Sequence, residues 1–221
     1  EDLLVGMTCG VVKGVGSTFF DIQHFIMTLA TMAICSGVGL LLSNGTPIQI
    51  AKEAADSAFL GFLGNGNIAG VPGPVIVFAI VAAAATFVLR YVPFGRFVYG
   101  IGGGVEAARL SGVPTARILI MVYAISGVCA AVAGIITTSR LFVGHPTAGS
   151  FIMLDSIAAV VIGGTSLMGG RGSVIGTVAG VFLLAMVANL RNLLGVSPFN
   201  QQTAKGAIII LAVLFTAHGL R

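Results

Sequence analysis

The sequence is short of charge. Asp, Glu, Lys and Arg make up only 8% of its 221 residues, whereas a soluble domain carries roughly 25%. Hydrophobic residues make up 57% of the chain. So few charges cannot cover a globular surface in water. The composition therefore excludes a soluble protein and predicts an all-α fold, a polytopic integral membrane helical bundle.

The chain also lacks the side-chain arrangements that bind metals or nucleic acid, or that break covalent bonds. Its three cysteines are far apart in sequence and have no metal-like spacing, which predicts buried, inert thiols: Cys9, Cys35 and Cys129. The three histidines are isolated, and no Ser-His-Asp or paired-carboxylate arrangement can be argued. The net charge of +4 includes no basic run interleaved with aromatics. We expect no metal, no nucleic-acid partner and no enzymatic activity.

Two glycine-rich runs look like nucleotide-binding loops but lack residues or neighbouring structure that such loops need. The run at 163–171 reads GGTSLMGGR, and a phosphate-binding loop needs Lys followed by Ser or Thr after its second glycine. The run at 102–104 has no strand before it. We therefore expect the chain to bind neither ATP nor another cofactor itself.

Long apolar runs predict the membrane spans, each near the ~20 residues that a bilayer core requires. The clear spans are 25–43, 75–89, 118–137 and 174–194. A shorter run at 3–12, which stops at Lys13, is expected to be the tail of a truncated helix. The sequence 58–63 predicts a short interfacial helix, and 206–217 a short final apolar segment.

The segment 153–168 is harder to assign, because Asp155 and the pair Gly163 and Gly164 interrupt it. It is either a short span or a broken, re-entrant element, and we favour a crossing. Ionisable groups inside a membrane are costly and indicate function. Asp155, Gly163, Gly164 and Thr165 are therefore candidates for a pathway or a broken helix. The plainer alternatives are a tight turn at the glycines and an N-cap at Asp155, and we favour the cap.

The loop at 90–117 carries four arginines and one acid, Glu106. Basic loops between spans usually face the cytoplasm. Residues 106–110 are good helix formers. The glycines at 102–104 free the chain where it enters this helix, and Gly112 with Pro114 ends the helix. The pattern predicts a short cytoplasmic helix, which either is solvated or fits a groove on a partner.

The same loop carries a family resemblance. Glu106-Ala107-Ala108, three residues and then Gly112 fit the coupling motif of bacterial ABC importer permeases. Five longer stretches resemble the ribose-type monosaccharide permeases: FGRFVYGIGGGVEAARLSGV, GHPTAGSFIMLDSIAAVVIGGTSLMGGRGSVIGT, NLLGVSPFNQQTAKGAIIILAV, FIMTLATM and SNGTPI. The resemblance covers nearly the whole chain. It identifies 1–221 as one transmembrane permease domain, the C-terminal two-thirds of a longer pattern. Members commonly have Asn where this chain has Gly104.

The resemblance implies a role in transport. A permease of this type sits in the bacterial inner membrane as a multi-pass protein and imports a monosaccharide or similar small solute by alternating access. Its partners are ATP-binding cassette subunits, which hydrolyse the ATP, a periplasmic sugar-binding protein and a second permease copy. The loop 90–117 would be the cytoplasmic coupling loop. The implied coupling residues are Glu106, Ala107, Ala108, Arg109, Leu110, Ser111 and Gly112.

An ion-coupled secondary transporter is the alternative. It would need buried ionisable residues along its pathway, and Asp155 is the candidate.

Overall fold

A computed structural model describes residues 2–19, 24–49, 58–68, 70–149, 152–166 and 169–193. The chain divides into two compact units. Unit 1 comprises Glu1–Val81 and Gly112–Ala148, and unit 2 comprises Ala82–Ser111 and Gly149–Arg221. The assignment of 1–221 to one permease domain stays a prediction, and the predicted segment 206–217 lies outside the described residues.

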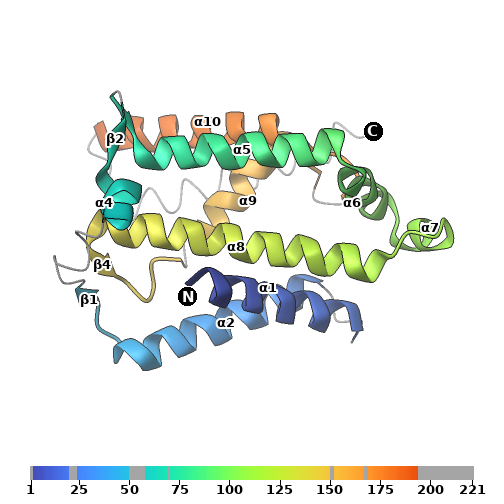
Figure 1. Ribbon diagram of the computed structural model, residues 1–221, viewed down its shortest axis with the longest axis horizontal. Helices are drawn as coiled ribbons and strands as arrows, with labels where there is room; N and C mark the ends of the chain where they lie inside the picture. The colour runs from blue at the N-terminus through green and yellow to red at the C-terminus, as the bar shows by residue number, and fades with distance from the viewer. Residues whose placement is uncertain are drawn as a thin grey trace. The chain divides into compact units, whose positions relative to one another are not determined.

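Helices dominate the described residues, so the all-α prediction is confirmed (Figure 1). The helices are α1 (Asp2–Phe19), α2 (His24–Ser43), α4 (Ala58–Asn65), α5 (Gly73–Tyr91), α6 (Pro93–Gly103), α7 (Val105–Leu110), α8 (Thr115–Leu141), α9 (Ile152–Ile162) and α10 (Val174–Leu193). The strands are β1 (Ile48–Gln49), β2 (Asn67–Ile68), β3 (Val71–Pro72) and β4 (Val143–Gly144).

Three helices in the described part of the chain are long and apolar enough to cross a membrane: α2, α5 and α8. They coincide with the predicted spans 25–43, 75–89 and 118–137, and α10 coincides with 174–194. Many of their large apolar side chains are exposed, as Ile34 and Ile80 illustrate. Such surfaces suit lipid rather than water, and the prediction of a multi-pass membrane protein is confirmed.

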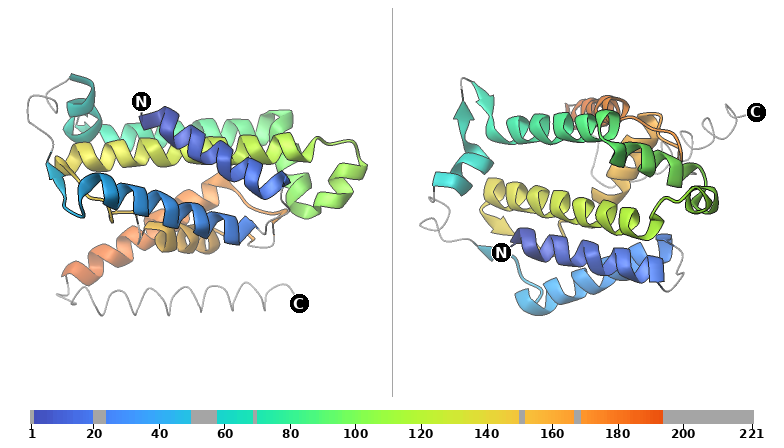
Figure 2. Two further views of the ribbon diagram at one scale, coloured as in Figure 1. Left: turned by 90° about the horizontal axis from the view of Figure 1, so that it is seen from below. Right: turned by 45° about the vertical axis from the view of Figure 1, so that its right-hand side comes forward.

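Unit 1 is organised around a close contact between α1 and α8, which lie side by side in both views of Figure 2. α1 carries glycines at intervals of four residues, a spacing that places them on one helix face: Gly6, Gly10 and Gly14. A methyl group built on Gly6 would lie 2.6 Å from the carbonyl oxygen of Gly127 on α8. One on Gly10 would collide with the carbonyl oxygen of Tyr123. Small residues at this interval let membrane helices approach to backbone contact.

α1 runs past the point where the sequence predicts its end. The predicted segment 3–12 stops at Lys13, but the helix continues to Phe19. The Lys13 ammonium lies over the Tyr123 ring, 5.6 Å from its centroid. This cation–π contact accommodates the charge within the helix. Near the end of α1, Ser17 Oγ shares a 2.8 Å hydrogen bond with His24 Nδ1 at the start of α2.

The cysteines also depart from prediction. The sulfurs of Cys9 on α1 and Cys35 on α2 lie 3.9 Å apart, although the two residues are 26 positions apart in the sequence. Cys35 and Cys129 are exposed, so the prediction of buried thiols is wrong for these two. The reason is that apolar segments in a membrane protein often face lipid rather than a protein core.

The connection between α2 and α5 contains short strands that the sequence does not predict. α2 ends at Ser43. The next two residues, Asn44 and Gly45, have φ of 50° and 71°, and Gly45 N–H donates to the Leu40 carbonyl at 3.0 Å. Further along, β1 pairs antiparallel with β4, Ile48 opposite Gly144. The predicted short helix at 58–63 is confirmed as α4, which packs on α8: a methyl on Gly64 would lie 2.5 Å from Ser139 Oγ.

Two glycines of α8 give opposite predictions for the same substitution. Gly127→Ala places a methyl group against the backbone of α1 and should lower the free energy of unfolding by about 1–3 kcal/mol. Gly134 has open space around it. Gly134→Ala should therefore be neutral or stabilise by up to about 1 kcal/mol through helix propensity. Thermal unfolding of the purified protein in detergent measures both, and equal shifts of the midpoint would contradict the proposed α1–α8 contact.

Candidate functional site

The segment 90–117 is more ordered than a loop. The predicted helix at 106–110 is confirmed as α7, Val105–Leu110. The expectation that the glycines at 102–104 free the entry is wrong for Gly102 and Gly103, because α6 occupies Pro93–Gly103, and only Gly104 breaks the chain before α7. Sequence reasoning missed α6 because glycine is a poor helix former. The available signal was Pro93 at the first helical position, where proline is favoured.

α7 is a short helix with a defined beginning and end. Gly104, with φ 170° and ψ 108°, separates it from α6. The Ala108 N–H donates to the Gly104 carbonyl at 3.0 Å, and Glu106 lies in the first turn, where a carboxylate suits the helix dipole. At the other end, Ser111 N–H and Ser111 Oγ donate to the Ala107 carbonyl at 3.1 and 2.8 Å.

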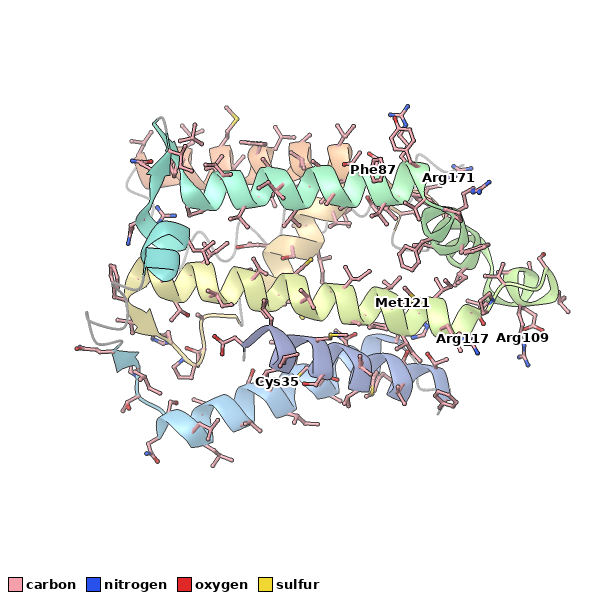
Figure 3. The ribbon with its side chains drawn as sticks, in the orientation of Figure 1. Cys35, Phe87, Arg109, Arg117, Met121 and Arg171 are labelled. Atoms are coloured by element: carbon pink, nitrogen blue, oxygen red, sulfur yellow. The ribbon has the colours of Figure 1, made fainter. Side chains whose placement is uncertain are left out.

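The outer surface of α7 is apolar in part. Ala108 is buried, whereas Val105 is 47% exposed and Leu110 is 81% exposed. Arg109 projects from the same helix (Figure 3), and Gly112, with φ of +80°, turns the chain away after it. A helix this short is not stable by itself. Exposed Leu and Val beside charged groups form a surface that a groove on another protein could cover.

α6 ties this segment to the turn that precedes α10. The Tyr99 hydroxyl donates to the Gly172 carbonyl at 2.8 Å, across 73 residues of sequence. A methyl group on Gly102 would lie 2.6 Å from the Gly170 nitrogen. Gly169 and Gly170 have φ of 88° and 74°, values that L side chains rarely adopt. α6 and this turn are therefore in direct backbone contact.

The element predicted at 153–168 is broken. α9 covers only Ile152–Ile162, 11 residues, or about 16 Å of helix, which cannot cross a core of about 30 Å. α9 alone is therefore too short to be a span, and whether the whole segment 153–168 crosses or is re-entrant stays a prediction. Gly164, with φ of +82°, ends the helix, and a methyl on Gly163 would lie 2.5 Å from the Gly176 carbonyl oxygen on α10. Thr165 N–H donates back to the Val160 carbonyl at 3.1 Å.

Asp155 does not occupy the N-cap position of α9. The helix begins at Ile152, which puts Asp155 inside its first turn, and Ser156 Oγ donates to the Ile152 carbonyl at 2.8 Å. Asp155 lines a cavity of about 270 Å³ between α9 and α10. Thr165 lines another of about 350 Å³. The candidates Asp155, Gly163, Gly164 and Thr165 therefore lie along one broken element. Their role in a pathway stays a prediction.

The chain is similar to a known protein family and to several known proteins. The family model described as branched-chain amino acid transport system / permease component matches residues 2–214. The chain is 42% identical over 212 residues to the ribose import permease protein RbsC of Haemophilus influenzae. It is 38% identical over 195 residues to the probable ABC transporter permease protein YphD of Escherichia coli. It is 33% identical over 267 aligned positions to the xylose transport system permease protein XylH of Escherichia coli.

The alignments cover most of this chain but less of the relatives. They span 96%, 88% and 96% of this chain, and 65%, 57% and 68% of the respective relatives. No solved structure matches the chain significantly.

The contact between α6 and the turn at 169–172 gives a prediction with a matched control. Gly102→Ala forces a methyl group into the turn, whereas Gly100, on the same helix, has open space around it. Because overpacking costs about 1–3 kcal/mol, Gly102→Ala should raise amide hydrogen exchange of a peptide covering 163–173 by about tenfold. Gly100→Ala should leave that exchange unchanged. Equal exchange in both variants would contradict the contact.

Proposed function

We propose a function from one premise: the chain belongs to the family described as branched-chain amino acid transport system / permease component. On this premise the protein is the membrane-spanning permease subunit of a bacterial ABC importer, a multi-pass protein of the inner membrane. It moves a monosaccharide or similar small solute by alternating access. ATP hydrolysis in partner subunits drives the movement.

The observation that carries this proposal is similarity along 96% of the chain to a protein named as a ribose import permease. A second relative is named as a xylose transport permease. Both names specify pentoses, which supports a small sugar as the substrate class. The three relatives compared are named as permeases, and we propose that this chain likewise performs transport rather than bond chemistry.

The proposed partners follow from the role. ATP-binding cassette subunits would bind and hydrolyse the nucleotide, so this chain would hold no ATP itself. A periplasmic sugar-binding protein would deliver the solute, and a second permease copy, identical or related, would complete the pathway.

We propose that α7 is the helix that docks into an ATP-binding subunit. Its exposed Val105 and Leu110 offer apolar contact area, with Glu106 and Arg109 as flanking charges. The residues assigned to this coupling surface are Glu106, Ala107, Ala108, Arg109, Leu110, Ser111 and Gly112. Because the loop would contact the partner differently in its two states, nucleotide binding could shift the permease between them.

A movement of α7 has a physical route into the membrane part of unit 2. Only Gly104 separates α7 from α6, and α6 contacts the turn at 169–172 through the Tyr99 hydroxyl. That turn connects α9 with α10. We propose that α6 transmits the displacement of α7 to the broken element that carries Asp155, Gly163, Gly164 and Thr165.

A charge reversal on α7 tests the coupling role. In the assembled transporter, Glu106→Lys should leave membrane insertion intact but lower solute uptake per ATP hydrolysed by about tenfold, because a misplaced charge at an interface costs a few kcal/mol. Asp2→Lys is the matched control, since Asp2 is an exposed carboxylate in the first turn of α1. Uptake and hydrolysis are measured together in proteoliposomes.

Normal uptake per ATP in Glu106→Lys would contradict the coupling role of α7. The same proteoliposomes separate the two transport classes. Uptake that requires ATP and survives an uncoupler supports the importer, whereas uptake that stops with the uncoupler and needs no ATP would establish the ion-coupled alternative.

A further inference from the structure

Two adjoining cavities open beside the end of α5 in unit 2. Their volumes are about 350 and 270 Å³. The lining residues that they share come from α5, α6 and the start of α10: Leu89, Tyr99, Ser173 and Val174. Each cavity also has one arginine of its own, Arg171 in the larger and Arg90 in the smaller. Together they form one cationic recess.

The charge of this recess is of one sign, since none of the described residues that line it is acidic. Several hydroxyls in its wall already donate elsewhere. Tyr99 donates to the Gly172 carbonyl at 2.8 Å, and Thr86 and Thr177 donate to carbonyls of their own helical segments at 2.7 and 3.1 Å. The guanidinium groups of Arg90 and Arg171 supply the positive charge of the wall, and their planar geometry suits phosphate oxygens. The Arg90 guanidinium also lies over the Tyr91 ring, 5.8 Å from its centroid.

Apolar side chains also line the recess and continue beyond it, which points to a lipid rather than a small soluble anion. Leu89, Val98, Val160 and Val174 line its walls. On the flanking helices, Phe87 is 59% exposed and Ile175 is 65% exposed. Figure 3 shows Phe87 and Arg171 near the same end of α5. Basic pockets between membrane helices, with an apolar surface leading from them, suit anionic lipid headgroups.

We propose that the recess of Arg90 and Arg171 binds the phosphate-bearing headgroup of an anionic phospholipid. Its acyl chains lie along the exposed apolar side chains of α5 and α10. The site requires the membrane location of the chain but no coupling role for α7, so the two proposals can fail separately.

Direct lipid binding tests the site. The assembled transporter is purified, stripped of lipid, and titrated with phosphatidylglycerol or phosphatidylcholine while native mass spectrometry counts the bound lipids. A basic residue near an anionic headgroup is worth about fivefold in affinity. Arg90→Gln and Arg171→Gln should each weaken phosphatidylglycerol binding by about that factor, and the double variant should lose it. Phosphatidylcholine binding should not change.

Two controls keep the result interpretable. Arg140→Gln removes a charge at the end of α8 and lines neither cavity, so it should bind phosphatidylglycerol as the wild type does. Arg171→Lys keeps the charge and should keep most of the binding. Equal phosphatidylglycerol binding by the double variant and by Arg140→Gln would overturn the proposal. Displacement of the bound lipid by millimolar inorganic phosphate would also overturn it and indicate a site for a soluble anion.

Discussion

Close approach of glycine backbones is the contact on which both units depend. In unit 1, Gly6 and Gly127 let α1 meet α8 at backbone distance. In unit 2, Gly102 meets Gly170, and Gly163 meets Gly176. Lipid offers little hydrophobic force to press apolar helices together, so association depends on dispersion contacts over closely matched surfaces. Some of the 32 glycines of the sequence therefore keep neighbouring segments packed at backbone distance.

The same glycines connect the parts of unit 2 that the proposed mechanism uses. A side chain at Gly102 would separate α6 from the turn before α10, and the Tyr99 hydroxyl bond to Gly172 closes this contact. Interfaces packed this tightly tend to move as units rather than deform continuously. A displacement of α7 would therefore reach the end of α9 through α6. The anionic lipid proposed at Arg90 and Arg171 would lie against the same junction, where it could influence this movement.

Hydropathy predicted the features that depend on local composition. Helices lie at the predicted spans 25–43, 75–89, 118–137 and 174–194 and at the predicted short helix 106–110, and three of them, α2, α5 and α8, are long and apolar enough to cross a membrane. Each depends on a run of apolar or helix-forming residues, which a single sequence reveals. The glycine break at 163–164 is also visible in a single sequence, because two adjacent glycines interrupt an apolar run.

The features that the sequence missed depend on tertiary contact. α6 forms despite its glycines because it packs against the turn at 169–172. α1 continues past Lys13 because the Tyr123 ring, far along the chain, receives the ammonium. The sulfurs of Cys9 and Cys35 come within 3.9 Å because α1 and α2 lie side by side. No local pattern could supply these partners.

The exposed leucine of α7 offers the most direct test of the proposed contact between α7 and an ATP-binding subunit. A photoreactive amino acid replaces Leu110, which is 81% exposed, in the assembled transporter, and the same amino acid at the exposed Leu141 in the last turn of α8 serves as the control. We expect a crosslink from position 110 to the ATP-binding subunit and none from position 141. A complex that assembles and hydrolyses ATP but gives no crosslink from position 110 would contradict it.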